Sequence, residues 1–228
     1  FFRLRIFLFS SFSFSFVFSQ VQVGNGTDTN QSLPIEPYYG YTYSQVIYTS
    51  AEINSSGDIS GVSYTATAET TLASSSDWTV YMAHTTNSSF VDGDSWEPIE
   101  NLTQMFSGTV SISDGIVTIP VDAAFSYNGT DNLVIAVEEN QAGYDSSVHD
   151  FYCSSTSDTR ALTFYSDGTN PDPTDPPSGT TKNFIANVTL NGISQSCANP
   201  TLSLDGLTNN SATISWSATD VTSFEYVL

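Results

Sequence analysis

The alternation of apolar and polar residues with a period of two is the feature that most restricts how this chain can fold. Between residues 78 and 84, Trp78, Val80 and Met82 share one face of an extended strand with His84. Apolar residues spaced three and four apart, which would indicate helices, are nearly absent. Further segments that predict strands are 42–50, 62–68, 116–121, 162–166 and 183–191.

Turn-forming residues separate these segments at short intervals. Asp114-Gly115 stands between Ile112 and the apolar segment 116–121, and it predicts a two-residue hairpin turn. The run 133–137 has no polar face, so we expect a strand buried on both sides. Many short strands joined by frequent turns predict an all-β fold, an antiparallel jelly-roll-like β-sandwich.

The proline-rich segment 166–181 has two interpretations. Its composition is typical of a linker between domains. A strand over 183–191 follows it, however, and that strand would have no sheet to join if the first domain ended before the prolines. We therefore expect a long loop inside a first domain that spans residues 20–193.

The N-terminus has the order of a signal peptide. Arg3 and Arg5 precede the apolar stretch Ile6–Phe18, and Ser19 offers a small residue at the cleavage position before Gln20. The stretch is too short and too rich in serine to span about 30 Å of hydrocarbon, although its Phe-Ser alternation also fits a strand. We expect residues 1–19 to be removed on export and the mature chain to be secreted, without insertion into a membrane.

The charge of the chain is strongly acidic and excludes one class of partner. Twenty-four Asp and Glu residues face four Lys and Arg residues, for a formal net charge of −20. After the N-terminal arginines, Arg160 and Lys182 are the remaining cations. Such a surface cannot displace counterions from a phosphate backbone, so we expect no binding to nucleic acid.

The last part of the chain has a pattern of its own, beyond a boundary near 194–198. Ala212, Ile214 and Trp216 share one face of a strand, with hydroxyl residues on the other. This segment resembles the first strands of a fibronectin type III domain, an immunoglobulin-like β-sandwich in which that Trp is a core residue. A complete sandwich of this kind has roughly 100 residues, so residues 198–228 would be a truncated N-terminal part.

A second resemblance covers residues 20–191 and implies where the protein works. The segments that carry it include Tyr43–Ile53, Trp78–Thr86 and Val137–Asp145. They resemble an N-terminal module of exported Bacteroidetes proteins, in particular of flavobacterial type IX-secreted surface proteins. The resemblance implies a cell-surface location and an adhesin-like architecture, and it brings no catalytic residues with it.

The residues offer little support for catalysis in this fragment. His84 and His149 are the only histidines, and neither has the spacing of a zinc site. No GxSxG motif occurs among the many serines. Cys153 and Cys197 could form a disulfide in an exported protein or remain two separate thiols. We therefore expect no enzyme within these residues.

Aromatic residues suggest a binding function instead. Tyrosines cluster between residues 38 and 48, and Trp96 stands in a turn-rich stretch. Exposed aromatic faces stack on sugar rings, so Tyr39, Tyr41 and Trp96 are candidate carbohydrate-binding residues. The alternative is that these rings fill the core or brace edge strands.

Acidic loops suggest a structural calcium ion, the one cofactor for which the sequence offers candidates. Calcium takes oxygen ligands from carboxylates and loop carbonyls. Asp92 and Asp94 lie in one such loop, and Asp167 and Asp172 lie in another. Plain polar turns would have the same composition.

These observations lead to one functional expectation and one alternative. We expect a non-catalytic module of a secreted or surface-attached bacterial protein, with a glycan or a protein as its ligand. The alternative is the accessory domain of a secreted peptidase or glycosidase whose catalytic domain lies outside this sequence.

Overall fold

The computed structural model describes residues 19–148, 150–194, 201–207 and 212–217. The chain divides into two compact units, Phe1–Ser194 and Gln195–Leu228, and each is treated by itself below. The described residues form antiparallel sheets and almost no helix, which confirms the predicted all-β fold class.

The larger sheet of the first unit has six strands and contains the strands with the clearest sequence pattern. Its central strand β8 (Asn132–Glu139) is buried from Leu133 to Val137, as its apolar run predicts, and the acidic Glu138 and Glu139 that follow are buried as well. Hydrogen bonding orders the sheet β11-β10-β2-β8-β4-β5. The other strands are β2 (Tyr41–Tyr48), β4 (Asp77–Thr85), β5 (Thr103–Thr109), β10 (Ala161–Ser166) and β11 (Thr180–Lys182).

The second sheet has five strands in the order β1-β13-β3-β7-β6. Its hairpin between β6 and β7 turns at Asp114 and Gly115, with φ angles of 52° and 76°. Positive φ at both positions suits a two-residue hairpin, so the predicted turn is confirmed. The strands are β1 (Gln20–Val23), β3 (Gly57–Thr65), β6 (Ile112–Ser113), β7 (Ile116–Tyr127) and β13 (Val188–Asn191).

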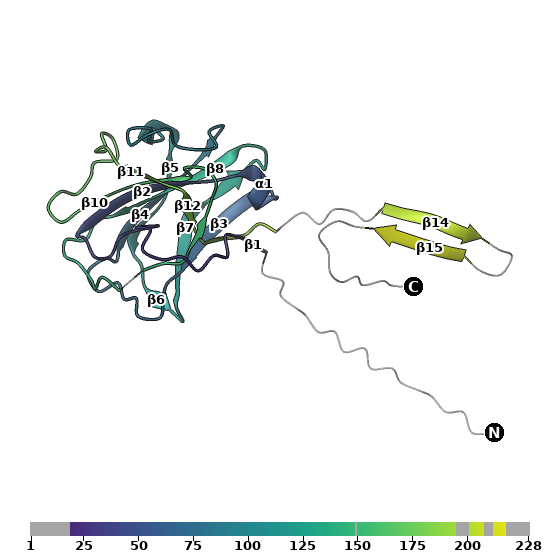
Figure 1. Ribbon diagram of the computed structural model, residues 1–228, viewed down its shortest axis with the longest axis horizontal. Helices are drawn as coiled ribbons and strands as arrows, with labels where there is room; N and C mark the ends of the chain where they lie inside the picture. Colours follow the sequence, from purple (N-terminus) through teal and green to yellow (C-terminus); the bar gives the residue numbers. More distant parts are fainter. Residues whose placement is uncertain (1–18, 149, 195–200, 208–211, 218–228) are drawn as a thin grey trace, which may run out of the picture. The chain divides into compact units, whose positions relative to one another are not determined.

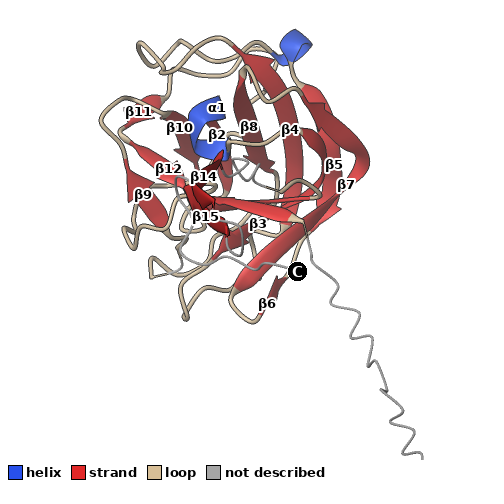
Figure 2. Ribbon diagram, turned by 90° about the vertical axis from the view of Figure 1, so that its right-hand side faces the viewer, coloured by secondary structure: helices blue, strands red, loops and turns tan. Residues whose placement is uncertain are grey.

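The two sheets pack face to face around one core, and β5 and β7 lie close together where the sheets meet (Figure 2). Trp78 of β4 lies in this core beside Tyr64 of β3 and Phe151. A short helix, α1 (Ser50–Ile53), follows β2 (Figure 1), and a 3-10 turn, η1, spans Ile99–Asn101. Other core residues come from alternate positions of the strands: Val62, Val80, Met82, Val117, Ile119, Leu133, Ile135 and Val137.

The structure corrects the prediction of one continuous strand over 183–191. The segment forms two strands, β12 (Phe184–Ala186), which pairs with β9 (Cys153–Ser155), and β13, which pairs with β1 and β3. Asn187 separates them: its side chain donates to the carbonyl of Gly26 at 2.7 Å and accepts from Ser154 at 2.6 Å. Asn187 itself lies outside both ladders, and its buried amide is hydrogen-bonded at the point where the segment passes from one sheet to the other.

The proline-rich residues 167–179 connect β10 and β11, which are neighbours in the six-stranded sheet. Their backbone is tied to the same unit, because Gly179 N donates to Gly93 O at 2.8 Å. The segment is therefore a loop of the first unit and does not connect two domains.

The second unit contains a described antiparallel pair, β14 (Thr201–Leu207) and β15 (Ala212–Ser217). The fibronectin type III assignment remains a prediction. The proposed signal peptide (residues 1–18 of its 19), His149, Cys197 and the expected third strand at 222–228 lie outside the described residues. Within the described part of the chain, no helix has the length and apolarity needed to cross a bilayer.

Candidate functional site

A tight turn at residues 36–39 presents two tyrosine rings at one end of the six-stranded sheet. Pro37 stands at the second position of the turn, which its fixed φ favours, and Tyr39 N donates to Glu36 O at 3.1 Å. The Glu36 carboxylate accepts from Tyr38 N at 3.3 Å and from the hydroxyl of Ser32 at 2.7 Å. The Glu36 carboxylate therefore connects the backbone of the turn to Ser32, which precedes it in the chain.

Two further tyrosines join them from distant parts of the chain. The rings of Tyr39 and Tyr165 lie with their centroids 4.4 Å apart, and those of Tyr38 and Tyr39 are 5.7 Å apart and nearly perpendicular. Tyr38 also contacts Tyr144 edge-on, at 6.1 Å. We call Tyr38, Tyr39, Tyr144 and Tyr165 the tyrosine platform.

The platform is open to solvent to a degree that is unusual for aromatic side chains. Tyr144 is 66% exposed, Tyr38 46% and Tyr165 37%. Aromatic side chains are normally buried in sandwich cores, as Trp78 and Tyr64 are here. A contiguous group of exposed rings is the kind of surface that ligand sites use.

Hydrogen bonds of Asp145 join two segments of the platform to each other and to Ser74 and Ser75. Asp145 N donates to Pro37 O at 2.7 Å, which joins the loop of Tyr144 to the turn of Tyr38. The Asp145 carboxylate accepts from Ser74 N at 3.2 Å and from the hydroxyl of Ser75 at 3.0 Å. These bonds hold the loop of Tyr144 against the turn that carries Tyr38 and Tyr39.

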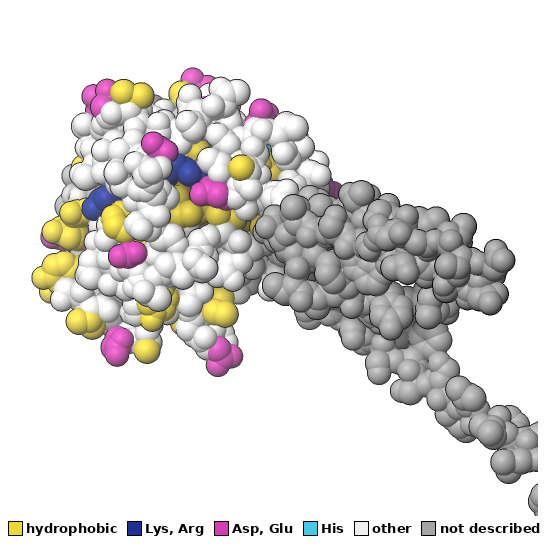
Figure 3. Space-filling view, turned by 45° about the vertical axis from the view of Figure 1, so that its right-hand side comes forward, with side chains coloured by type: hydrophobic (Ala, Val, Ile, Leu, Met, Phe, Trp, Pro, Cys, Tyr) yellow, Lys and Arg dark blue, Asp and Glu magenta, His cyan; other side chains and the backbone are white. Residues whose placement is uncertain are grey.

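The electrostatic field at the platform is negative. Partial burial raises the pKa of Tyr39, and the nearby Tyr165, Asp167 and Glu36 act in the same direction. Asp167 directly follows the strand β10 that ends beside Tyr165, and its side chain is exposed. One face of the molecule shows acidic side chains scattered among neutral ones, with only small basic patches (Figure 3).

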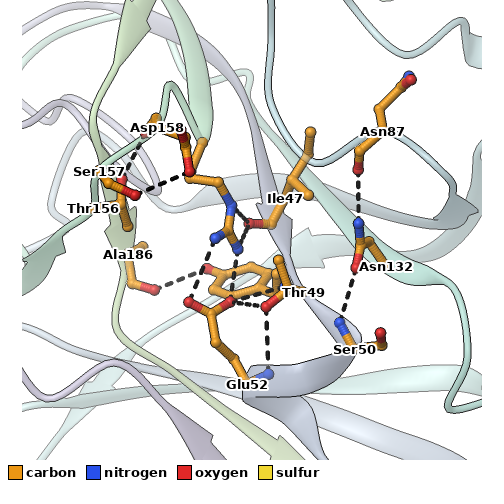
Figure 4. A network of polar contacts seen from close by, with 12 residues as sticks. Ile47, Thr49, Ser50, Glu52, Asn87, Asn132, Thr156, Ser157, Asp158 and Ala186 are labelled. Carbon is orange, nitrogen blue, oxygen red and sulfur yellow. Dashed lines mark hydrogen bonds and ion pairs between the residues drawn. The ribbon is translucent and has the colours of Figure 1, made fainter.

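One of the two cations in residues 19–148 and 150–194 is used internally. Arg160 is 6% exposed; it donates to the Ile47 carbonyl and forms an ion pair with Glu52, Nη2 to Oε2 at 2.7 Å. Glu52 also completes a capping box with Thr49 at the start of α1 (Figure 4). The network ties β2, α1 and β10 together and leaves this guanidinium unavailable to a ligand.

The three carbohydrate-binding candidates from the sequence do not form one site. Tyr39 belongs to the platform. Trp96 instead packs on Tyr43 at 4.9 Å, on the outer face of the six-stranded sheet, and its Nε1 donates to Pro177 O at 3.0 Å. Tyr41 alternates with Tyr43 along β2 and so shares that outer face. Sequence reasoning missed Tyr144 and Tyr165, because only tertiary contacts bring them to Tyr39.

Two of the four calcium candidates, Asp92 and Asp172, accept hydrogen bonds within their own local turns. Asp92 accepts from Asp94 N at 3.1 Å and from the Ser95 hydroxyl at 2.6 Å. Asp172 accepts from Thr174 N at 2.9 Å. In the segments whose side chains the structure describes, no three His, Cys, Asp or Glu side chains form a group that could hold a metal ion.

A thiol and a carboxyl group lie inside the sandwich, away from solvent. Cys153 is fully buried, and desolvation raises the pKa of its thiol. Glu139 is 1% exposed; Gln141 N donates to its Oε1 at 2.7 Å, and its Oε2 has no hydrogen-bond partner. Neither group is placed to meet a ligand from solution.

Comparison of the chain with known protein families, with curated proteins and with solved structures gives no match.

Proposed function

We propose that this chain is a non-catalytic module of a secreted or cell-surface protein and that it binds carbohydrate on the tyrosine platform. The single observation that carries the proposal is the group of four tyrosine rings, of which Tyr38, Tyr144 and Tyr165 are exposed and Tyr39 is half-buried, with the ring centroids of Tyr39 and Tyr165 4.4 Å apart. Sugar rings present an apolar face of C–H groups that stacks on aromatic rings, and carboxylates beside them accept hydrogen bonds from sugar hydroxyls.

The surroundings of the platform support binding more than chemistry. The carboxylates of Glu36 and Asp145 are hydrogen-bonded to the backbone or to serine hydroxyls. These bonds position the platform and occupy the oxygens that general acid–base catalysis would use. The predicted export of the chain would place such a surface outside the cell, where glycans are abundant.

A glycan array probed with the complete chain tests this proposal. We expect binding to a subset of glycans and a loss of at least about tenfold in affinity in Tyr144→Ala, which removes the most exposed ring. Tyr144 has little burial to lose, so the variant should keep its fold, which circular dichroism verifies.

Trp96→Phe is the matched control. It keeps an aromatic ring near Tyr43 and lies outside the platform, while it removes the indole N–H that donates to Pro177 O, so we expect it to leave glycan binding unchanged. Binding that survives Tyr144→Ala and is lost in Trp96→Phe would place the site on the outer face of the six-stranded sheet instead. No binding to any glycan would reject the carbohydrate proposal.

A further inference from the structure

We propose that the glycan bound on the tyrosine platform is cationic, a chain of amino sugars with free ammonium groups such as glucosamine oligomers. This inference rests on the proposed function and names the ligand class for the same site. It follows from the juxtaposition of the tyrosine platform with an uncommitted carboxylate that neither Arg160 nor Lys182, the two cations among residues 19–148 and 150–194, can neutralise.

The uncommitted carboxylate is that of Asp167. Its backbone carbonyl lies beside Gly40, at 3.3 Å from where a side chain at position 40 would begin, so Asp167 borders the turn that presents Tyr38 and Tyr39. Glu36 and Asp145 each accept protein hydrogen bonds, as described above. Among the described residues, no side-chain hydrogen bond or ion pair engages the Asp167 carboxylate, and its side chain is exposed.

Neither of the two cations among residues 19–148 and 150–194 lies where it could neutralise this group. Arg160 is buried and paired with Glu52. Lys182 pairs in register with Ala161, at the beginning of β10, whereas Asp167 follows the end of that strand at Ser166. Six residue steps of about 3.3 Å separate positions 161 and 167, about 20 Å in all, which is more than two Debye lengths at physiological salt. Neither Arg160 nor Lys182 therefore compensates the negative charge beside the platform.

The tyrosine rings favour the same ligand charge. The face of an aromatic ring attracts ammonium groups, and the attraction strengthens where a carboxylate adds its charge. An amino sugar satisfies both features at once, because its ring stacks while its ammonium group faces the carboxylate. Uronic acids and sulfated glycans would instead be repelled by Asp167 and by the net charge of −20.

Two sets of oligosaccharides that differ only in acetylation test the inference. The complete chain is titrated with glucosamine oligomers and with N-acetylglucosamine oligomers of the same length, at low and at high salt. We expect tighter binding of the glucosamine oligomers, an affinity that falls as salt rises, and a loss of about five- to tenfold in Asp167→Asn. Asp122→Asn, an exposed acid on β7 in the other sheet, is the matched control and should leave affinity unchanged.

The outcomes separate this inference from the proposed function. Equal affinity for the two oligomer sets, or preferred binding of another neutral glycan, with no effect of Asp167→Asn, would overturn the charge preference and leave the carbohydrate site in place. Binding of neither set nor of any arrayed glycan would reject both. A loss of affinity in Asp122→Asn equal to that in Asp167→Asn would also overturn the inference, because it would indicate only the general charge of the chain.

Discussion

The side-chain amide of Gln45 pairs with the backbone of Glu97 in both directions. Glu97 N donates to Gln45 Oε1 at 2.7 Å, and Gln45 Nε2 donates to Glu97 O at 2.9 Å. Gln45 is fully buried on the outer face of β2. Its side-chain amide satisfies both the N–H and the C=O of Glu97, as the backbone of a paired strand would. This pairing holds the segment around residue 97 over the sheet and places Trp96 on Tyr43.

We expect Gln45→Ala to destabilise the first unit by about 2–3 kcal/mol, because the substitution leaves a backbone N–H and C=O of Glu97 without partners and opens a small cavity. Urea denaturation followed by tryptophan fluorescence measures the change. Gln104→Ala, at an exposed position of β5, is the control and should change stability by less than about 0.5 kcal/mol. Equal effects of the two substitutions would show that the Gln45–Glu97 pairing adds nothing.

The Arg160–Glu52 pair gives a second prediction, in which geometry matters more than charge. Arg160→Lys keeps the positive charge but cannot serve both the Ile47 carbonyl and the Glu52 carboxylate with a fork of donors. We expect it to lower the free energy of unfolding by about 1–3 kcal/mol, in line with buried hydrogen bonds to charged groups. Lys182→Arg is the matched control at the half-buried cation. If Arg160→Lys has the stability of the unsubstituted chain, the charge alone holds the network.

The buried carboxyl of Glu139 predicts that stability falls as pH rises. Burial raises the pKa of Glu139 to about 8, and the nearby Asp77 and Asp145 act in the same direction, against the hydrogen bond from Gln141 N. The group must therefore take up a proton on folding at any pH between its unfolded pKa and about 8. The resulting cost is absent at acidic pH, grows as pH rises and is complete above the folded pKa, where it is on the order of 2–4 kcal/mol.

Glu139→Gln should remove this dependence. We expect the variant to be more stable than the unsubstituted chain above pH 8 or so and to differ little from it in mild acid. Urea midpoints measured across this pH range check the expectation, with the exposed Glu69→Gln as control. A pH profile that keeps its slope in Glu139→Gln would assign the titration to another group.

The acidic turns predict that chelation of divalent metal ions leaves the melting temperature unchanged. Hydrogen bonds from the Ser95 hydroxyl and, to a smaller extent, Asp94 N lower the pKa of Asp92, and those from Thr174 lower the pKa of Asp172. These bonds stabilise the turns without an ion. Thermal melts with EDTA and with added calcium test this expectation. A melting temperature that rises with calcium would contradict it and support the calcium site predicted from the sequence.

The parts of the fold that the sequence predicts correctly depend on neighbours in the chain. Strand β4, the doubly buried β8 and the Asp114-Gly115 turn are readable because alternation and turn conformation are local properties. The division at Asn187 is not, because its partners Gly26 and Ser154 come from distant segments.

The same limit applies to the candidate site. Tyr39 stands out in the sequence through its tyrosine neighbours, whereas Tyr144 and Tyr165 join it only through the Asp145–Pro37 hydrogen bond and the pairing of β10 with β2. Trp96 also stands out in the sequence as an aromatic residue in a polar stretch. In the structure the Gln45–Glu97 pairing places its ring against Tyr43, outside the platform.

The proline-rich connection between β10 and β11 has a consequence for how the sequence can change over time. Two antiparallel neighbours in a sheet can be joined by as few as two residues, so the sandwich does not require the length of residues 167–179. Insertions and deletions there leave every strand in register. Because the connection begins at Asp167, beside Tyr165, such changes alter the border of the tyrosine platform while the sheets stay as they are. The border of the platform can therefore change in sequence faster than the fold does.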